Sequence, residues 1–258
     1  MKWLNTKNIR LTSVFLAQDL RGRYVGSTMG IFWNIINPLI TISLYTLVFQ
    51  VILKQKSNDH PYYIVYLFCG MLPWMAVSEA LIRSTVTILE NANLVKKVVF
   101  PKEILIINVI LSSFTHELIG LALFMILLIA VGTPPGIYAS LIILVFMLQL
   151  IFSAGLGFFF STLNIFVRDT TPLLQSTLFL WFLSTPIIYP SEALPLWIQK
   201  YCLLNPLYLL VRMYRSVLLK NQLMDIKELI IFCVMTIAIF FVGIVYFKKN
   251  KQEFADYI

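Results

Sequence analysis

The sequence predicts an all-α integral membrane protein with six transmembrane helices. Of its 258 residues, 59% are hydrophobic and only 12% are charged, and the mean hydropathy is +0.85. An ordinary soluble domain is nearer half apolar and a quarter charged. Several apolar runs reach the roughly 20 residues that a helix needs to cross about 30 Å of hydrocarbon. Membrane insertion therefore explains the composition.

The first expected element is an N-terminal amphipathic interface helix within residues 1–30, ahead of a transmembrane domain over residues 31–258. Leu11, Val14 and Phe15 are spaced i, i+3 and i+4, so they share one helical face, and charged residues mark the opposite side. We expect this helix to lie on the inner leaflet. A solvated helical tail is the alternative.

Six apolar segments follow, each bounded by charge, proline or glycine. The expected transmembrane helices are 31–53, 62–82, 104–131, 138–163, 170–189 and 229–247. Six crossings place both termini on one side of the membrane. With cytoplasmic termini, 13 of the 20 basic residues lie on the cytoplasmic side, as the positive-inside rule requires. The basic residues lie between apolar runs rather than on one surface, so the net charge of +8 does not indicate a nucleic-acid partner.

Segment 190–228 is assigned to the extracytoplasmic side although it carries five basic residues. Two prolines divide it into apolar pieces too short to cross alone, so we expect short re-entrant or surface-lying helices before the last span. The alternative is a seventh crossing over residues 203–219. That crossing would place Arg212 and Arg215 in hydrocarbon at a cost of several kcal/mol.

A search for chemistry finds no phosphate-binding loop, no H-E-x-x-H, no G-x-S-x-G and no calcium loop. We therefore expect no catalytic site, metal or cofactor on this chain, so that any energy the protein uses must come from elsewhere. His116 and Glu117, in the middle of the third span, are the candidates for proton chemistry. They point about 100° apart on a helix, so the alternative is that each bonds polar groups on a neighbouring helix. Glu79 and Arg83 are expected to form an i, i+4 ion pair at the inner end of the second span.

Polar and aromatic residues align on one face of the first span and one face of the fifth. They are Asn34, Asn37, Thr41, Tyr45 and Phe49 on the first span, and Gln175, Phe179, Phe182 and Tyr189 on the fifth. Aromatic rings pack on the C–H faces of sugars, and amides and hydroxyls bond sugar hydroxyl groups. These faces are candidates for the wall of a sugar path. Ordinary helix packing is the alternative.

Four sequence blocks resemble the polysaccharide-exporting branch of the ABC-2 permease family. They are RYVGSTMGIFW at 23–33 followed by Asn37-Pro38; NANLVKKVVFPKEI at 91–104; Arg168-Asp169 with STPIIYP at 184–190; and LNPL at 204–207 with Arg212, Tyr214 and Arg215. The blocks follow the family order and cover nearly the whole chain. The resemblance is greatest to O-antigen (Wzm-type) and teichoic-acid exporter permeases.

The resemblance implies a homodimer in the inner (cytoplasmic) membrane, bound to two copies of a separate cytoplasmic ATPase that uses ATP and Mg. The expected substrate is an undecaprenyl-pyrophosphate-linked glycan, most closely an O-antigen, which leaves the cytoplasm between the two permease chains. Export of teichoic acid or a capsule glycan, or of drugs or lipids, is the alternative within the fold. A membrane enzyme acting on lipid-linked sugars is the alternative in another class, but no acid, base or nucleophile cluster supports it.

The resemblance also implies a cytoplasmic coupling helix in the second-to-third loop. The residues expected to contact the ATPase are Leu94, Val95, Lys96, Lys97 and Val98. A basic entrance for the lipid pyrophosphate is expected at Arg21, Arg23, Lys97 and Arg168, because the arginine fork donates two parallel hydrogen bonds to phosphate. Alternatively these residues anchor the chain to anionic lipid in general.

Overall fold

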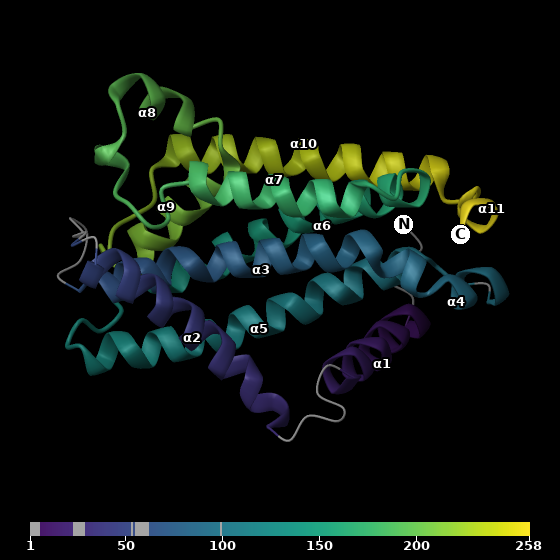
Figure 1. Cartoon of the computed structure of the whole chain (residues 1–258), viewed down its shortest axis with the longest axis horizontal. Coiled ribbons are helices and arrows are strands. Elements are labelled where there is room, and N and C mark those ends of the chain that lie inside the picture. Colours follow the sequence, from purple (N-terminus) through teal and green to yellow (C-terminus); the bar gives the residue numbers. More distant parts are fainter. Residues whose placement is uncertain (1–5, 23–28, 53, 55–61, 99) are drawn as a thin grey trace.

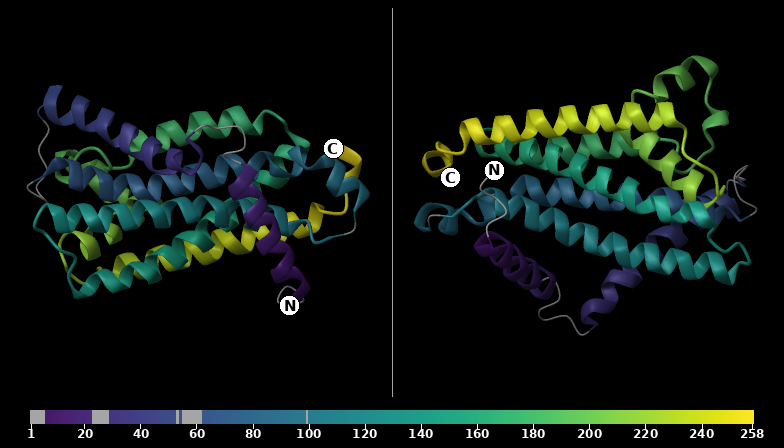
Figure 2. Two further views of the ribbon diagram at one scale, coloured as in Figure 1. Left: turned by 90° about the horizontal axis from the view of Figure 1, so that it is seen from below. Right: turned by 180° about the vertical axis from the view of Figure 1, so that it is seen from behind.

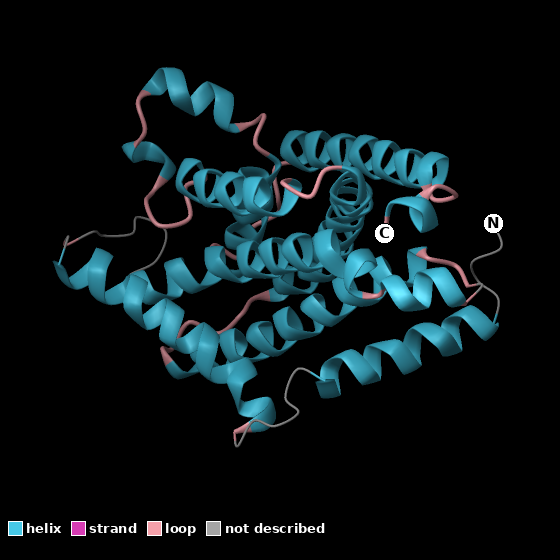
Figure 3. Ribbon diagram, turned by 45° about the vertical axis from the view of Figure 1, so that its right-hand side comes forward, coloured by secondary structure: helices cyan, strands magenta, loops and turns pink. Residues whose placement is uncertain are grey.

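A computed structural model describes residues 6–22, 29–52, 54, 62–98 and 100–258, and every regular element in these ranges is helical (Figures 1 and 3). The α-helices are α1 Thr6–Gly22, α2 Trp33–Thr46, α3 Tyr63–Glu90, α4 Ala92–Lys97, α5 Glu103–Ala130, α6 Ile142–Phe166, α7 Thr170–Ser184, α8 Leu196–Cys202, α9 Pro206–Leu218, α10 Ile226–Asn250 and α11 Phe254–Tyr257. Short 3-10 turns cover Gly30–Phe32, Ile137–Leu141 and Ser191–Ala193, and a π-helical turn covers Leu47–Ile52. The predicted all-α class is confirmed.

The long helices form a bundle in which α3 packs against α5, α6, α7 and α9 (Figure 1). Five segments of the described chain are long and apolar enough to cross a membrane. They are Ile35–Ile52, Tyr63–Glu90, Glu103–Ala130, Ile137–Phe166 and Ile226–Asn250. Of these, Tyr63–Glu90 is the most deeply buried and Ile35–Ile52 the least. The chain is therefore a multi-pass membrane protein with α3 in its core and α2 at its edge.

The fifth expected span, 170–189, is shorter than predicted. Its helix α7 ends at Ser184 after 15 residues, which span only about 22 Å. Thr185 is extended, with φ −96° and ψ 127°, because the residue before a proline avoids helical backbone and Pro186 follows. Unlike the five long segments, α7 is therefore too short to cross about 30 Å of hydrocarbon by itself.

Segment 190–228 contains two short helices, as predicted. Helix α8 projects from the bundle, whereas α9 returns into it and packs against α3, α6 and α10 (Figures 1 and 2). The side chain of Asn205 accepts hydrogen bonds from the backbone N–H groups of Leu207 and Tyr208, and Pro206 occupies the first helical position. At 13 residues α9 is too short to cross a membrane, so the structure does not support a seventh crossing over 203–219.

Two glycines set the close contact between α6 and α10. A Cβ atom added at Gly155 would lie 2.6 Å from Cα of Phe240, and one added at Gly243 would lie 2.0 Å from the backbone oxygen of Gly155. Only glycine allows the two backbones to approach this closely. The opposite face of α10 is exposed and apolar, at Val234, Ile237, Phe241, Val242 and Val245.

Candidate functional sites along the helix bundle

Three of the aromatic residues predicted to line a sugar path meet where α2 and α7 approach α3. The ring of Tyr45 stacks on Phe49 at 6.1 Å between centroids and meets the ring of Phe182 edge-on at 5.6 Å. Phe182 also lies 5.3 Å from Trp74 of α3 and is only 4% exposed. The expectation that Phe182 faces an open path therefore does not fit its burial, because α2 and α3 cover its ring.

The other path residues of the fifth span are placed differently. Gln175 and Phe179 are exposed, and 61% of Phe179 is accessible. Tyr189 is half-buried, and its hydroxyl donates a hydrogen bond to the backbone oxygen of Leu183 at 2.7 Å. The residues predicted on one face of α7 are thus divided between a buried side, which includes Phe182, and an exposed side.

On α2, Asn37 is exposed and borders a cleft of about 240 Å³ between α2, α3 and α5. Thr41 is half-buried, and the side chain of Asn34 lies outside the described residues. The cleft wall includes Trp33, Asn37, Glu79, Ser113, His116 and Glu117. The polar face of the first span therefore borders the two residues singled out for proton chemistry.

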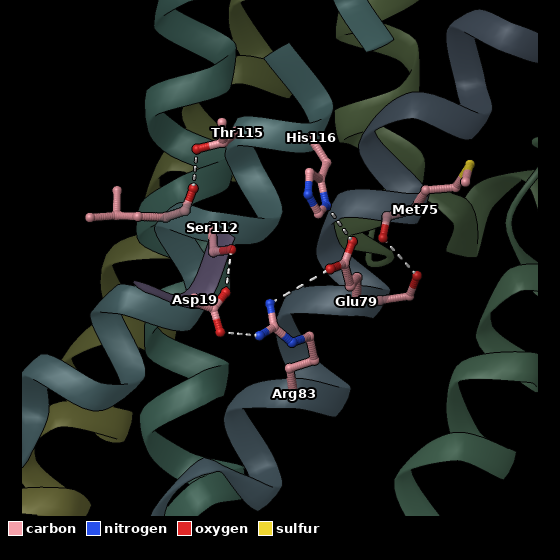
Figure 4. Close-up of polar contacts among 9 residues, drawn as sticks. Asp19, Met75, Glu79, Arg83, Ser112, Thr115 and His116 are labelled. Atoms are coloured by element: carbon pink, nitrogen blue, oxygen red, sulfur yellow. Dashed lines mark hydrogen bonds and ion pairs between the residues drawn. The ribbon is translucent and has the colours of Figure 1, made fainter. Parts of the chain in front are cut away.

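A chain of polar contacts connects this cleft to the N-terminal helix (Figure 4). His116 Nδ1 lies 3.5 Å from Glu79 Oε2, and Arg83 Nη1 lies 3.8 Å from Glu79 Oε1. Arg83 Nη2 donates to Asp19 Oδ1 at 2.6 Å, and the Ser112 hydroxyl donates to Asp19 Oδ2 at 2.5 Å. The predicted ion pair of Glu79 and Arg83 forms, but not at a helix end, because α3 continues to Glu90. It forms part of the attachment of α1 to α3 and α5.

Glu117 belongs to a separate buried network. Its carboxylate accepts hydrogen bonds from the Tyr214 hydroxyl at 2.7 Å and from Gln149 Nε2 at 2.9 Å. The Tyr214 oxygen also lies 2.6 Å from Gln149 Oε1. His116 therefore bonds α3, whereas Glu117 bonds α6 and α9. This agrees with the alternative that each residue bonds polar groups on a neighbouring helix. The sequence did not indicate Gln149 and Tyr214 as the partners.

The predicted coupling segment forms the short helix α4, but its residues divide between two roles. Val95 is 5% exposed and belongs to the hydrophobic core, so its expected contact with an ATPase is not compatible with this packing. Leu94 is half-buried against the same core. Lys96, Lys97 and Val98 are exposed, and Val98 is 48% accessible. Of the five residues predicted to contact the ATPase, only these three therefore lie on the exposed surface.

The C-terminal segment supports α4 and the start of α5. The Nζ of Lys96 donates to the backbone oxygen of Ile258, Lys102 Nζ donates to the backbone oxygen of Lys251 at 2.9 Å, and Lys251 Nζ pairs with Glu103 Oε1 at 3.0 Å. Burial, and secondly the positive charge of Lys251, lowers the pKa of Lys102. Sequence reasoning missed this contact. Its apolar signals are Phe254, which is fully buried, Tyr257, which packs on Phe166, and Ile258.

The expected basic entrance is only partly described. Lys97 and Arg168 are exposed, and Arg168 lies in the turn between α6 and α7. Arg23 and the side chain of Arg21 lie outside the described residues. The entrance therefore stays a prediction.

Comparison with known proteins identifies the family. Residues 10–219, most of the chain, match the family described as ABC-2 type transporter. The chain belongs to the ABC-2 type transporter family. This ABC-2 protein is 30% identical over 250 residues to the O-antigen export system permease protein RfbA of Klebsiella pneumoniae, with 95% of this chain and 94% of that protein covered.

Two further relatives of this ABC-2 protein also match over nearly their full length. It is 27% identical to the O-antigen export system permease protein RfbA of Myxococcus xanthus, over 93% of this chain and 92% of the relative. It is 24% identical to the polysialic acid transport protein KpsM of Escherichia coli, over 95% of both. The relatives of this ABC-2 chain are thus transport proteins for polysaccharides.

Proposed function

We propose that the chain is the membrane permease subunit of an exporter that moves a lipid-linked polysaccharide from the cytoplasm across the inner membrane. The observation that carries the proposal is the near-full-length similarity to O-antigen export permeases, at 27–30% identity. An O-antigen carried on undecaprenyl pyrophosphate is the proposed substrate. The polysialic acid relative, at 24% identity, supports a capsule glycan as the second candidate.

Energy for this movement comes, in the proposal, from two copies of a separate ATPase that dock at α4. The exposed side chains of Lys97 and Val98 support this role, because they offer charge for orientation and apolar area for contact. The packing of Val95 and α11 would hold α4 rigid, so that a movement of the ATPase passes to α3 and α5.

A homodimer that meets through α2 and α7 accounts for polar side chains on the exposed surfaces of both helices. They are Asn37, Ser43 and Gln50 on or next to α2, and Gln175, Ser176, Thr177 and Ser184 on α7. Polar groups facing hydrocarbon are costly. A second copy, with the glycan path between the chains, would remove these side chains from lipid. The exposed face of α10 is apolar and suits lipid contact.

The contact between α4 and α11 supports six crossings with both termini in the cytoplasm. Helix α11 packs on α4, so an even number of crossings must connect these two elements. The long helices α5, α6 and α10 supply three crossings. In the proposal, α7 and the irregular segment 185–190 together supply the fourth.

Deletion of the gene tests the proposed function directly. The mutant should lose polysaccharide from the cell surface and accumulate carrier-linked polymer in the cytoplasm, and the wild-type gene should restore both. Normal surface polysaccharide in the mutant would contradict the proposal. Altered drug sensitivity with normal polysaccharide would favour a drug exporter.

A further inference from the structure

Three buried side chains from different helices form a closed ring of polar contacts, which we call the buried ring. They are Glu117 of α5, Gln149 of α6 and Tyr214 of α9, and none is more than 3% exposed. The Tyr214 oxygen lies 2.7 Å from Glu117 Oε1 and 2.6 Å from Gln149 Oε1, and Gln149 Nε2 lies 2.9 Å from Glu117 Oε2. All three separations are hydrogen-bond distances, so each contact requires one proton between its two atoms.

The protons available to the buried ring can be counted. The Tyr214 hydroxyl supplies one, and the Gln149 amide supplies one because it turns its nitrogen to one partner and its oxygen to the other. If Glu117 is a carboxylate that accepts from Tyr214, the contact of the Tyr214 oxygen with Gln149 Oε1 has no proton. Turning the amide over only moves the missing proton to the contact of Gln149 with Glu117. In either orientation the third proton has to come from the Glu117 carboxyl group.

The charges around Glu117 lead to the same conclusion. The groups that act electrostatically on it are Tyr214 and Gln149, and no lysine or arginine of the described chain pairs with it. Glu103, the other buried glutamate of α5, pairs with Lys251 Nζ at 3.0 Å. Glu117 lies in the candidate span Glu103–Ala130, where an unpaired carboxylate is costly and a protonated, hydrogen-bonded carboxyl group is not.

The ionisable groups of α9 and α3 near the buried ring do not offset a charge on Glu117. Arg215 follows Tyr214 in α9, but its guanidinium lies over the ring of Tyr66 in α3, and it is not among the groups that act on Glu117. Cys69 of α3 acts on the Tyr214 hydroxyl. A thiol can contribute only negative charge, so Cys69 cannot balance a carboxylate.

The cleft beside Glu117 holds two further ionisable side chains. Glu79 of α3 and His116 of α5 line it and lie 3.5 Å apart, so the charge of His116, when it is protonated, is opposed by that of Glu79. The described residues of α2 that line the cleft are uncharged. The helices packed around Glu117 therefore supply no counter-charge from their described residues.

We propose that Glu117 is a proton-binding site, whose carboxyl group carries a proton and donates it within the buried ring. Glu117 donates to the Tyr214 oxygen, Tyr214 donates to Gln149 Oε1, and Gln149 Nε2 donates to Glu117 Oε2. Each contact then has one donor and one acceptor. Gln149 Nε2 also donates to the backbone oxygen of Pro73 at 3.3 Å. The bound proton thus completes a joint between α5, α6, α9 and α3, and this role does not depend on which substrate the protein exports.

Infrared spectroscopy of the purified full chain at neutral pH tests for the proton directly, because the carbonyl stretch of a carboxylic acid is separated from the bands of carboxylates and amides. Glu117→Gln should remove a carboxylic-acid band that the wild type shows. Glu103→Gln is the matched control, since it makes the same change in a glutamate paired with a lysine, and it should keep the band. A wild type without the band, or a band that persists in Glu117→Gln, would overturn the proposal.

Two further measurements test the ring itself. Glu117→Gln should keep the Tm of the wild type, because the new amide can donate to Tyr214 and accept from Gln149 as the protonated carboxyl group does. Tyr214→Phe should shift the carboxylic-acid band, since Glu117 loses its acceptor. Tyr63→Phe removes a buried hydroxyl that bonds the backbone oxygen of Ile188 instead and should leave the band in place. A large loss of Tm in Glu117→Gln, or an unshifted band in Tyr214→Phe, would contradict the proposed ring.

Discussion

Phe179 and Phe182 are three residues apart on α7 but have different surroundings. Phe182 packs between Tyr45 and Trp74, whereas Phe179 is 61% exposed. We expect Phe182→Ala to lower the free energy of unfolding by about 3–5 kcal/mol, because it leaves a cavity among aromatic rings. Phe179→Ala should change it by less than about 0.5 kcal/mol. Yield of folded protein and Tm in detergent measure both effects.

Cysteine labelling separates the exposed position from the buried one during transport. In a variant without the native cysteines, Cys introduced at position 179 should react with a water-soluble reagent while export proceeds, and Cys at position 182 should stay protected. Equal protection at both positions would remove Phe179 from the proposed path. Loss of stability in Phe179→Ala would instead indicate that a partner covers this side chain.

The polar residues show how far sequence reasoning reaches at this scale. Helical geometry predicted that His116 and Glu117 point apart, with bonding to a neighbouring helix as the alternative to proton chemistry, and the contacts with Glu79, Gln149 and Tyr214 agree with that alternative. The partners themselves could not be predicted, because they depend on how α5 is aligned with α3, α6 and α9. Similarly, a rotation of 100° per residue placed Phe179 and Phe182 on one face of the helix. It does not predict which part of that face a neighbouring helix covers.

At the scale of elements, Asp19 is the clearest attachment of α1 to the bundle. Its carboxylate accepts a charge-assisted hydrogen bond from Arg83 and a hydrogen bond from Ser112. Because a hydrogen bond to a charged group is worth about 1.5–3 kcal/mol, Asp19→Asn should raise amide hydrogen exchange in α1 about tenfold. The exposed neighbour Gln18 provides the control, since Gln18→Asn should leave exchange unchanged. Unaltered exchange in Asp19→Asn would mean that apolar contacts alone hold α1.

The exposed part of α4 gives a second prediction about an element. Lys97→Glu should weaken association with the ATPase and lower its stimulated turnover, because the reversed charge would face the docking surface. Lys248→Glu makes the same charge change at an exposed position in the last turn of α10 and should have little effect. Co-purification of the ATPase measures the outcome. Normal assembly and export in Lys97→Glu would remove α4 from the coupling role.

Helix boundaries show what hydropathy can and cannot predict. The second span was expected to end at residue 82, but α3 continues to Glu90, because apolar length reports the thickness of the membrane and not the end of the hydrogen-bonded helix. The fifth span was expected to reach residue 189, but Pro186 ends α7 at Ser184. This second error was avoidable, since the proline is visible in the sequence.

At the scale of the whole molecule, composition alone predicted the multi-pass helical class, but not which helices lie in the core. Tyr63–Glu90 and Ile35–Ile52 have similar hydropathy, yet the first is largely buried and the second is largely exposed. Burial of this kind depends on close contacts such as Gly155 with Gly243, and these join residues far apart in the chain. The end of the bundle where α11 meets α4 depends on the same long-range packing.

The exposed surfaces lead to a final prediction about assembly. Leu44 of α2 and Ile237 of α10 are both exposed apolar residues, at 59% and 65%, so hydrophobicity does not distinguish them. The α2 and α7 surfaces also carry exposed polar side chains, which lipid solvates poorly, whereas the exposed side chains of α10 near Ile237 are apolar. In a variant without native cysteines, Leu44→Cys should therefore form a disulfide-linked dimer in membranes under mild oxidation, and Ile237→Cys should stay monomeric. A dimer linked through Ile237→Cys alone would place the interface on α10 and would require a glycan path elsewhere.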